Sequence, residues 1–155
     1  KRKLRMTILQ QAQKLAARYS TNNPREILHA LGIVVMEVPI EGIRGIYKRV
    51  QRNTFVFVDS SLDERTQLFV LGHELGHHIY HRGQNRVFLD RYTLMVPSKA
   101  ETEADTFSVC LMGYDPSEIV FEGEGVEQIA ARLGVEQRLA WLYMEELRKN
   151  RYFKQ

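Results

Sequence analysis

Residues 69–81 read FVLGHELGHHIYH and contain the motif His73-Glu74-Leu75-Gly76-His77, an H-E-x-x-H pattern. The stretch is mostly apolar, and Ser61 followed by Glu64 is typical of a capping box that opens a helix, here expected from Leu62 to about His81. Side chains four residues apart on a helix face the same way, about 6 Å apart. The two imidazoles can therefore bind one metal ion, and the motif decides what the rest of the chain must supply.

Glu74 follows the first histidine and faces nearly the same side of the predicted helix. From there it can act as the general base toward a water molecule, so Glu74 is the predicted catalytic residue of a metal hydrolase. His73 and His77 are the predicted metal ligands. The alternative is a buried helix in which the two histidines are only hydrogen-bonded.

Catalytic zinc usually takes three protein ligands, so one more is needed. Ser98 and Glu101 form a second capping-box pattern, which predicts a helix to about Met112 and assigns Glu101 to the cap. Glu103 stands beside small and apolar positions, and a buried acid needs a partner such as a metal. We therefore predict Glu103 as the third ligand, with Glu101 as the weaker candidate. The alternative is a solvated acidic first turn that favours the helix dipole.

Other polar residues near the motif have less defined roles. His78 and His81 are expected at the surface or behind the ligands, because neither can share an ion with His73 and His77. Asp105 is a candidate to hold one histidine through its other ring nitrogen. Tyr80 or Tyr92 could donate to a developing oxyanion, and the sequence does not choose between them.

The pattern along the chain predicts an α+β fold in a single domain over residues 1–155. Helical spacing over Leu4–Tyr19 and an Asn23-Pro24 start predict two N-terminal helices, the second ending at Gly32. The β-branched or alternating segments predict a small antiparallel meander of three strands, namely Ile33–Val38, Gly42–Val50 and Asn53–Val58. Residues 84–97 are expected to form a loop. Two closing helices are expected over Val126–Leu133 and Glu136–Asn150.

The composition is that of an ordinary globular protein: 44% of the 155 residues are apolar and 26% are charged. These values argue against a disordered or fibrous chain. The longest stretch without a Lys, Arg, Asp or Glu is ten residues, Ile27–Met36, which is too short for a membrane-spanning helix. A single cysteine, Cys110, and the lack of a signal-peptide pattern favour the cytoplasm.

Charge is distributed unevenly along the chain. Residues 1–60 carry a net charge of +7 and residues 61–155 a net charge of −4, which together give the total of +3. A basic N-terminal part could contact nucleic acid or an acidic partner. No DNA-binding pattern accompanies it, so we expect a solvated surface and no direct binding of nucleic acid.

The chain resembles the ImmA/IrrE family of zinc metallopeptidases through two motifs. One is the H-E-x-x-H stretch, and the other is Glu101-Thr-Glu103-Ala-Asp105, which matches the E-x-E-A-N/D pattern of the family. The resemblance implies a zincin-like helix with His73, His77 and Glu103 as zinc ligands and Glu74 activating water. The chain departs from the family at Cys110-Leu-Met-Gly-Tyr, where a Leu-Leu-Met-Pro-like end is common.

This resemblance implies a cytoplasmic zinc endopeptidase that cleaves a helix-turn-helix repressor of phage, mobile-element or stress-response genes. One zinc per chain is expected, although manganese or iron can also occupy a site of two histidines and one carboxylate. Substrate could pair with a free sheet edge at Asn53–Val58. The alternatives are a metal-containing module that binds the repressor without much proteolysis, and a component of a toxin–antitoxin system.

Overall fold

The computed structural model describes residues 5–89 and 97–153, and its architecture is α+β. Helices and strands follow one another in the order α1 (Ile8–Tyr19), α2 (Pro24–Ala30), β1 (Val34–Val38), β2 (Ile43–Val50), β3 (Asn53–Asp59), α3 (Glu64–Tyr80), β4 (Arg86–Leu89), α4 (Lys99–Met112), the 3-10 turn η1 (Pro116–Glu118), α5 (Val126–Leu133) and α6 (Gln137–Lys149). The fold class expected from the sequence is confirmed.

The sheet differs from the expected antiparallel meander of three strands. It has four strands in the order β1-β3-β2-β4, and β1 runs parallel to β3 while the other pairs are antiparallel. Short connections favour pairing between consecutive strands, but β3 carries the fully buried Val56 and Val58 and lies between β1 and β2. The fourth strand, β4, lies in the segment that was expected to be a loop.

This order also corrects the expected substrate edge. The segment Asn53–Val58 belongs to β3, whose backbone pairs with β1 on one side and β2 on the other. Among the described residues, β1 and β4 are the outer strands of the sheet. An added strand can therefore pair only with one of those two.

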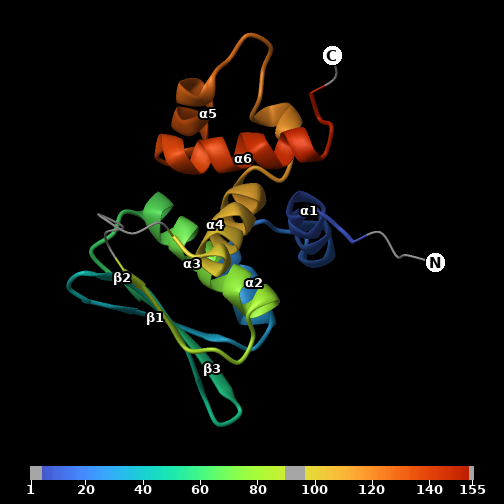
Figure 1. Ribbon diagram of the computed structural model, residues 1–155. Helices are drawn as coiled ribbons and strands as arrows, with labels where there is room; N and C mark the ends of the chain where they lie inside the picture. The colour runs from blue at the N-terminus through green and yellow to red at the C-terminus, as the bar shows by residue number, and fades with distance from the viewer. Residues whose placement is uncertain (1–4, 90–96, 154–155) are drawn as a thin grey trace.

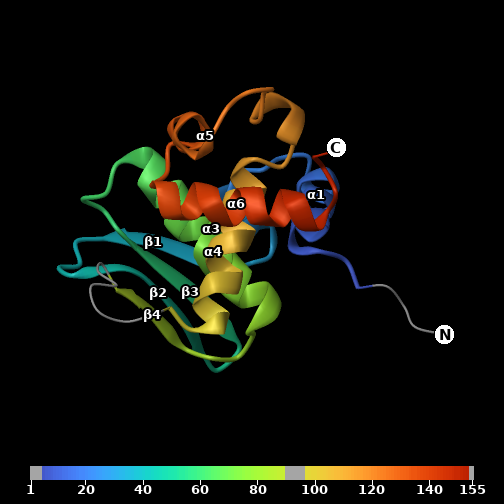
Figure 2. The same cartoon turned by 45° about the horizontal axis from the view of Figure 1, so that its top comes forward.

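Helix α3 lies between the sheet and helix α4 (Figure 1). It packs closely on β2, where a Cβ placed on Gly45 would lie 2.7 Å from Cγ1 of Val70 and 3.7 Å from Cγ of Glu74. Figure 2 shows α6 crossing over α4 on the side away from the strands. The core between these layers is formed by buried apolar side chains of α3, α4, β3 and α6, including Val58, Leu71, Leu75, Phe107 and Tyr143.

Two glycines of α3 allow α4 to approach its backbone. A Cβ on Gly72 would lie 2.3 Å from Oγ of Ser108, and one on Gly76 would lie 3.1 Å from the backbone Cα of Ala104. The Ser108 hydroxyl donates a 2.7 Å hydrogen bond to the Phe69 carbonyl across the same contact. The motif helix is therefore held against the helix that carries the second acidic motif.

The start of α3 differs from the expected capping box at Ser61. Asp63 is the N-cap, and its side chain accepts a hydrogen bond from the backbone N–H of Thr66. The Ser61 hydroxyl instead donates to Asp59 at 2.8 Å. In α4 the expected cap is present, since Ser98 accepts from the Glu101 N–H at 3.2 Å. Over residues 5–89 and 97–153, the helices are too short or too polar to cross a bilayer.

Replacing Gly72 with alanine should destabilise the protein by about 1–3 kcal/mol, because the new methyl group must push α4 away. Helix propensity alone would give the opposite sign, a gain of about 1 kcal/mol. Urea unfolding followed by circular dichroism measures the change. Gly125→Ala is the control, because a Cβ there meets only Oε1 of Gln128 at 3.6 Å. A Gly72→Ala protein as stable as the wild type would contradict the close approach of the helices.

Candidate metal centre

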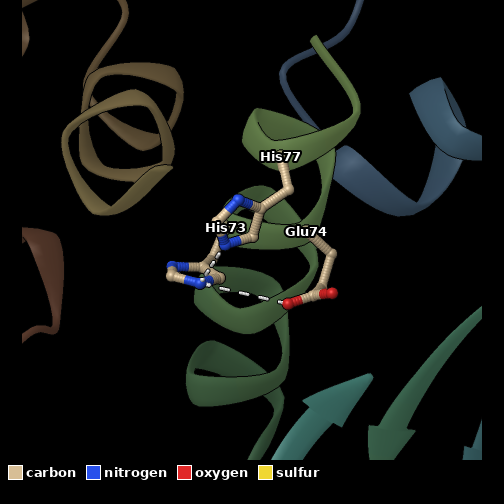
Figure 3. Close-up of side chains that lie close together, drawn as sticks. All are labelled: His73, Glu74 and His77. Atoms are coloured by element: carbon tan, nitrogen blue, oxygen red, sulfur yellow. Dashed lines mark hydrogen bonds and ion pairs between the residues drawn. The ribbon is translucent and has the colours of Figure 1, made fainter. Parts of the chain in front are cut away.

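His73 and His77 lie one turn apart on α3, and their rings turn toward each other (Figure 3). Both are fully buried, and their Nε2 atoms are 3.0 Å apart. Each Nδ1 has its own partner: that of His73 lies 2.7 Å from Oδ1 of Asp105, and that of His77 lies 2.9 Å from Nδ1 of His81. A partner that accepts the Nδ1 proton leaves the Nε2 lone pair free to bind a metal.

Glu101 completes this pair from α4. One carboxylate oxygen lies 2.9 Å from Nε2 of His73, and the other lies 3.1 Å from Nε2 of His77. Ligand atoms that share a tetrahedral zinc ion at 2.0–2.1 Å stand roughly 3.3 Å from one another. The two imidazole nitrogens, 3.0 Å apart, and a carboxylate that approaches each of them with one oxygen form a donor set that fits zinc and similar divalent ions.

The structure does not bring Glu103 to the two histidines, so the expected position of this residue is wrong. One Glu103 oxygen lies 3.2 Å from Nε2 of His81, and its side chain is 36% exposed, compared with 18% for Glu101. Glu101 was assigned to the helix cap because of Ser98, yet only its backbone N–H takes part in that cap. Its carboxylate points away from the cap, toward the histidines.

The sequence does contain a signal for Glu101. Glu101 and Asp105 are four residues apart, so they share one face of α4. That face holds His73 by both nitrogens, with Asp105 at Nδ1 and Glu101 at Nε2. The placement of Asp105 at the second ring nitrogen of one histidine, which was one of the open possibilities, is confirmed. Taken together with Asp105, helical spacing favours Glu101 over Glu103.

Glu74 is fully buried, and neither of its carboxylate oxygens has a hydrogen-bond partner. Glu74, His73 and His77 each offer a ligand atom, and these atoms lie within 4.8 Å of one another. Oε1 of Glu74 is 4.0 Å from Nε2 of His73, farther than the Glu101 oxygens (Figure 3). This distance suits a base that acts on a molecule near the centre better than it suits a direct ligand.

The electrostatics of the centre favour a positive charge at Nε2 of His73. Burial by itself lowers the pKa of His73, but hydrogen bonds to Asp105 and Glu101 outweigh it and raise the pKa to about 9. For Glu101, burial raises the pKa, but the hydrogen bonds to His73 and His77 prevail and hold it well below the usual range. Burial raises the pKa of Glu74 to about 8, near the value that suits a general base at neutral pH.

A further set of side chains supports the ligands. Nη2 of Arg138, from α6, lies 3.0 Å from Oδ2 of Asp105, which ties α6 to the centre. The Phe88 ring of β4 stacks on the ring of His73 at a centroid distance of 3.9 Å. His81 links His77 to Glu103. The two buried histidines are therefore oriented by acids, an aromatic ring and a cation from three different elements.

Two of the remaining candidates, Tyr80 and His78, have hydrogen-bond partners outside the histidine pair. The hydroxyl of Tyr80 donates to the side chain of Gln11, away from the histidine pair. His78 forms a 2.8 Å hydrogen bond with the Tyr47 hydroxyl beneath the sheet. Tyr92 lies outside the described residues. Neither hydrogen bond involves His73, His77 or Glu101.

Comparison with known proteins identifies the family of the chain. Residues 28–143 match the family model Peptidase_M78, described as the IrrE N-terminal-like domain. The chain is also 35% identical over 135 residues to "Uncharacterized immunity region protein 2" of Bacillus phage phi105, an alignment that covers 84% of each protein. No solved structure matches the chain significantly. The matched region contains the histidine pair, Glu74 and both acidic positions of α4, and the chain belongs to the Peptidase_M78 family of IrrE N-terminal-like domains.

Proposed function

We propose that the chain is a zinc-dependent endopeptidase in which His73, His77 and Glu101 hold the metal. The observation that carries this proposal is the Glu101 carboxylate, whose two oxygens lie 2.9 and 3.1 Å from the two Nε2 atoms, beside a buried Glu74 without a hydrogen-bond partner. A buried carboxylate that lacks a partner is costly unless it serves the reaction. Membership of a peptidase family supports the same reaction.

Different residues of the chain have different roles in the proposed hydrolysis. A bound zinc ion supplies Lewis acidity, which polarises the scissile carbonyl and lowers the pKa of a water molecule. Glu74 accepts a proton from that water as the water oxygen bonds to the carbonyl carbon. Glu74 then delivers the proton to the amide nitrogen as the carbon–nitrogen bond breaks. Asp105 and His81 keep the two imidazoles in the tautomer and orientation that leave Nε2 available.

The substrate that we propose is a helix-turn-helix repressor, cleaved in the cytoplasm so that the genes it controls are expressed. Two findings support this choice. The similar phage protein is named for an immunity region, and the two motifs resemble those of repressor-cleaving ImmA/IrrE proteins. A substrate protein of this kind would be recognised through its own fold, with no direct contact between the peptidase and DNA.

We propose β4 as the strand along which the substrate segment lies. It is an outer strand of the sheet, and it reaches the centre through Phe88, on His73, and Arg86, near Glu101. Backbone pairing with an outer strand orients an extended chain without demanding much sequence. The other outer strand, β1, pairs with β3 and packs beside α2, away from the histidines.

Metal content should separate the two glutamates of α4. The wild-type protein should retain about one zinc per chain, and Glu101→Ala should lose most of it because one of three ligands is gone. Glu103→Ala is the matched control and should weaken binding by about tenfold at most, since Glu103 acts only through His81. Elemental analysis and competition with a chromophoric chelator measure both. Loss of zinc in Glu103→Ala with zinc retained in Glu101→Ala would instead identify Glu103 as the ligand.

Glu74→Gln should abolish cleavage while metal and repressor binding persist. Loss of the base should lower the rate by about 10²–10⁴-fold. The test is co-expression with the repressor encoded by the neighbouring gene, followed by mass analysis of repressor fragments. Glu64→Gln, an exposed change in the first turn of α3, is the control. If Glu74→Gln relieves repression as well as the wild type, the protein acts by binding and the peptidase proposal fails.

The Glu74→Gln protein also allows the β4 proposal to be tested. Hydrogen exchange should slow at residues 86–89 when the zinc-loaded variant binds the repressor, because new backbone hydrogen bonds form there. Exchange at residues 34–38 in β1 serves as the internal reference and should stay unchanged. Protection at β1 without protection at β4 would place the substrate at the opposite edge of the sheet and contradict this proposal.

A further inference from the structure

Three buried side-chain atoms lack a hydrogen-bond partner within residues 5–89 and 97–153, and all three flank the metal centre. Two are the carboxylate oxygens of Glu74, and the third is Nε of Arg86. Glu74 can only accept when ionised, and the Arg86 guanidinium can only donate. Native proteins rarely leave such atoms without a partner unless another molecule supplies one. A peptide bond and a water molecule would together supply both a donor and an acceptor.

The sheet directs Arg86 toward the centre. Arg86 is paired with Tyr47 across β2 and β4, and residues opposite each other in an antiparallel pair share a face of the sheet. Tyr47 is fully buried and its hydroxyl reaches His78 of α3, so this is the face that α3 covers. The Arg86 side chain is 21% exposed, and its Nη1 lies 3.5 Å from Oε1 of Glu101.

The remaining contacts of Arg86 leave Nε available. Its Nη2 donates to the side chain of Gln84 on the approach to β4. Burial raises the pKa of Glu74 and lowers the pKa of His77. The positive charge of Arg86 lowers both pKa values by a smaller amount. Arg86 thus lies beside Glu101 at the edge of the cluster, and its charge acts on the proposed base.

We propose that Arg86 is a catalytic residue that donates through Nε to the carbonyl oxygen of the scissile peptide as negative charge develops there. This inference rests on the proposed peptidase function and supplies an oxyanion donor, a role for which the Tyr80 hydroxyl is already engaged with Gln11. The water oxygen bonds to the carbonyl carbon, and the carbon–oxygen double bond of the peptide becomes a single bond. The electron pair of the broken π bond moves to the carbonyl oxygen, which becomes negatively charged. A buried, charged donor stabilises this oxyanion more than the neutral carbonyl of the substrate, so it accelerates the reaction.

A competing role for Arg86 is purely structural, in which it only neutralises Glu101. The two roles predict different measurements. A residue that positions Glu101 would change metal affinity when removed, whereas an oxyanion donor would leave metal affinity nearly unchanged. An oxyanion donor would also discriminate between ligands of different shape, because it contacts only an oxygen bound to a tetrahedral centre.

The test uses two probes on the zinc-loaded full chain. One is an alanine-based phosphinic dipeptide, whose tetrahedral phosphinate imitates the attacked carbonyl, and the other is acetohydroxamate, a planar anionic chelator. Arg86→Gln should weaken phosphinate binding by roughly 10- to 100-fold, the range of a charge-assisted hydrogen bond, with little change for hydroxamate. Arg86→Lys should recover only part of the loss, because lysine keeps the charge and loses the Nε donor. Arg49→Gln, an exposed arginine of β2, is the charge-matched control.

Cleavage of the co-expressed repressor gives a second measurement. Arg86→Gln should lower kcat by about 10²-fold and change KM little, as expected for an interaction made in the transition state. Zinc affinity, from chelator competition, should stay within about threefold of the wild type for a group that does not hold a ligand.

Two outcomes would overturn the proposal for Arg86. One is an Arg86→Gln protein that loses zinc, and the other is one that binds phosphinate and cleaves repressor like the wild type. In both cases zinc binding and cleavage by the wild-type protein would leave the peptidase function intact. Absence of zinc binding in the wild type would instead overturn both the proposed function and the role of Arg86.

Discussion

The close contact between α3 and α4 is the constraint on which the centre depends. Gly72 and Gly76 let the backbone of α4 approach α3, with Ala104 and Ser108 on the facing side. At this separation the short side chains of Glu101 and Asp105 reach both nitrogens of His73. A larger residue in place of either glycine would separate the helices, and the carboxylates would no longer meet the imidazoles.

Burial determines which charges in this contact need a partner. Glu74, Glu101 and Asp105 lie around two imidazoles in a region from which water is largely excluded, and buried charges of this kind are costly without partners. Asp105 is compensated by Arg138 and by His73. The metal ion that we propose would compensate Glu101 and leave each imidazole bound through Nε2, in keeping with membership of a peptidase family. Glu74 is left without a partner, as a base needs to be.

The sheet contributes through β4 more than through its other strands. This strand brings an aromatic ring onto His73 and a guanidinium beside Glu101, and it is an outer strand. In the reaction that we propose, this one strand would orient His73, bring a positive charge to the reacting oxygen and offer backbone to an extended chain. Helix α6, through Arg138, provides the opposing support from the far side of α4.

The sequence by itself determined the helix that carries His73, Glu74 and His77, the α+β class and the family, because each follows from local spacing. It did not decide between Glu101 and Glu103, because a capping box and a ligand helix share the same local pattern. The sequence also did not predict the strand order or the strand β4. Strand β3 lies between β1 and β2, where Val56 and Val58 are fully buried. Only the tertiary structure brought Arg86 and Glu101, fifteen positions apart and on different elements, to one point. Such a contact depends on how a strand and a helix pack, which no local periodicity records.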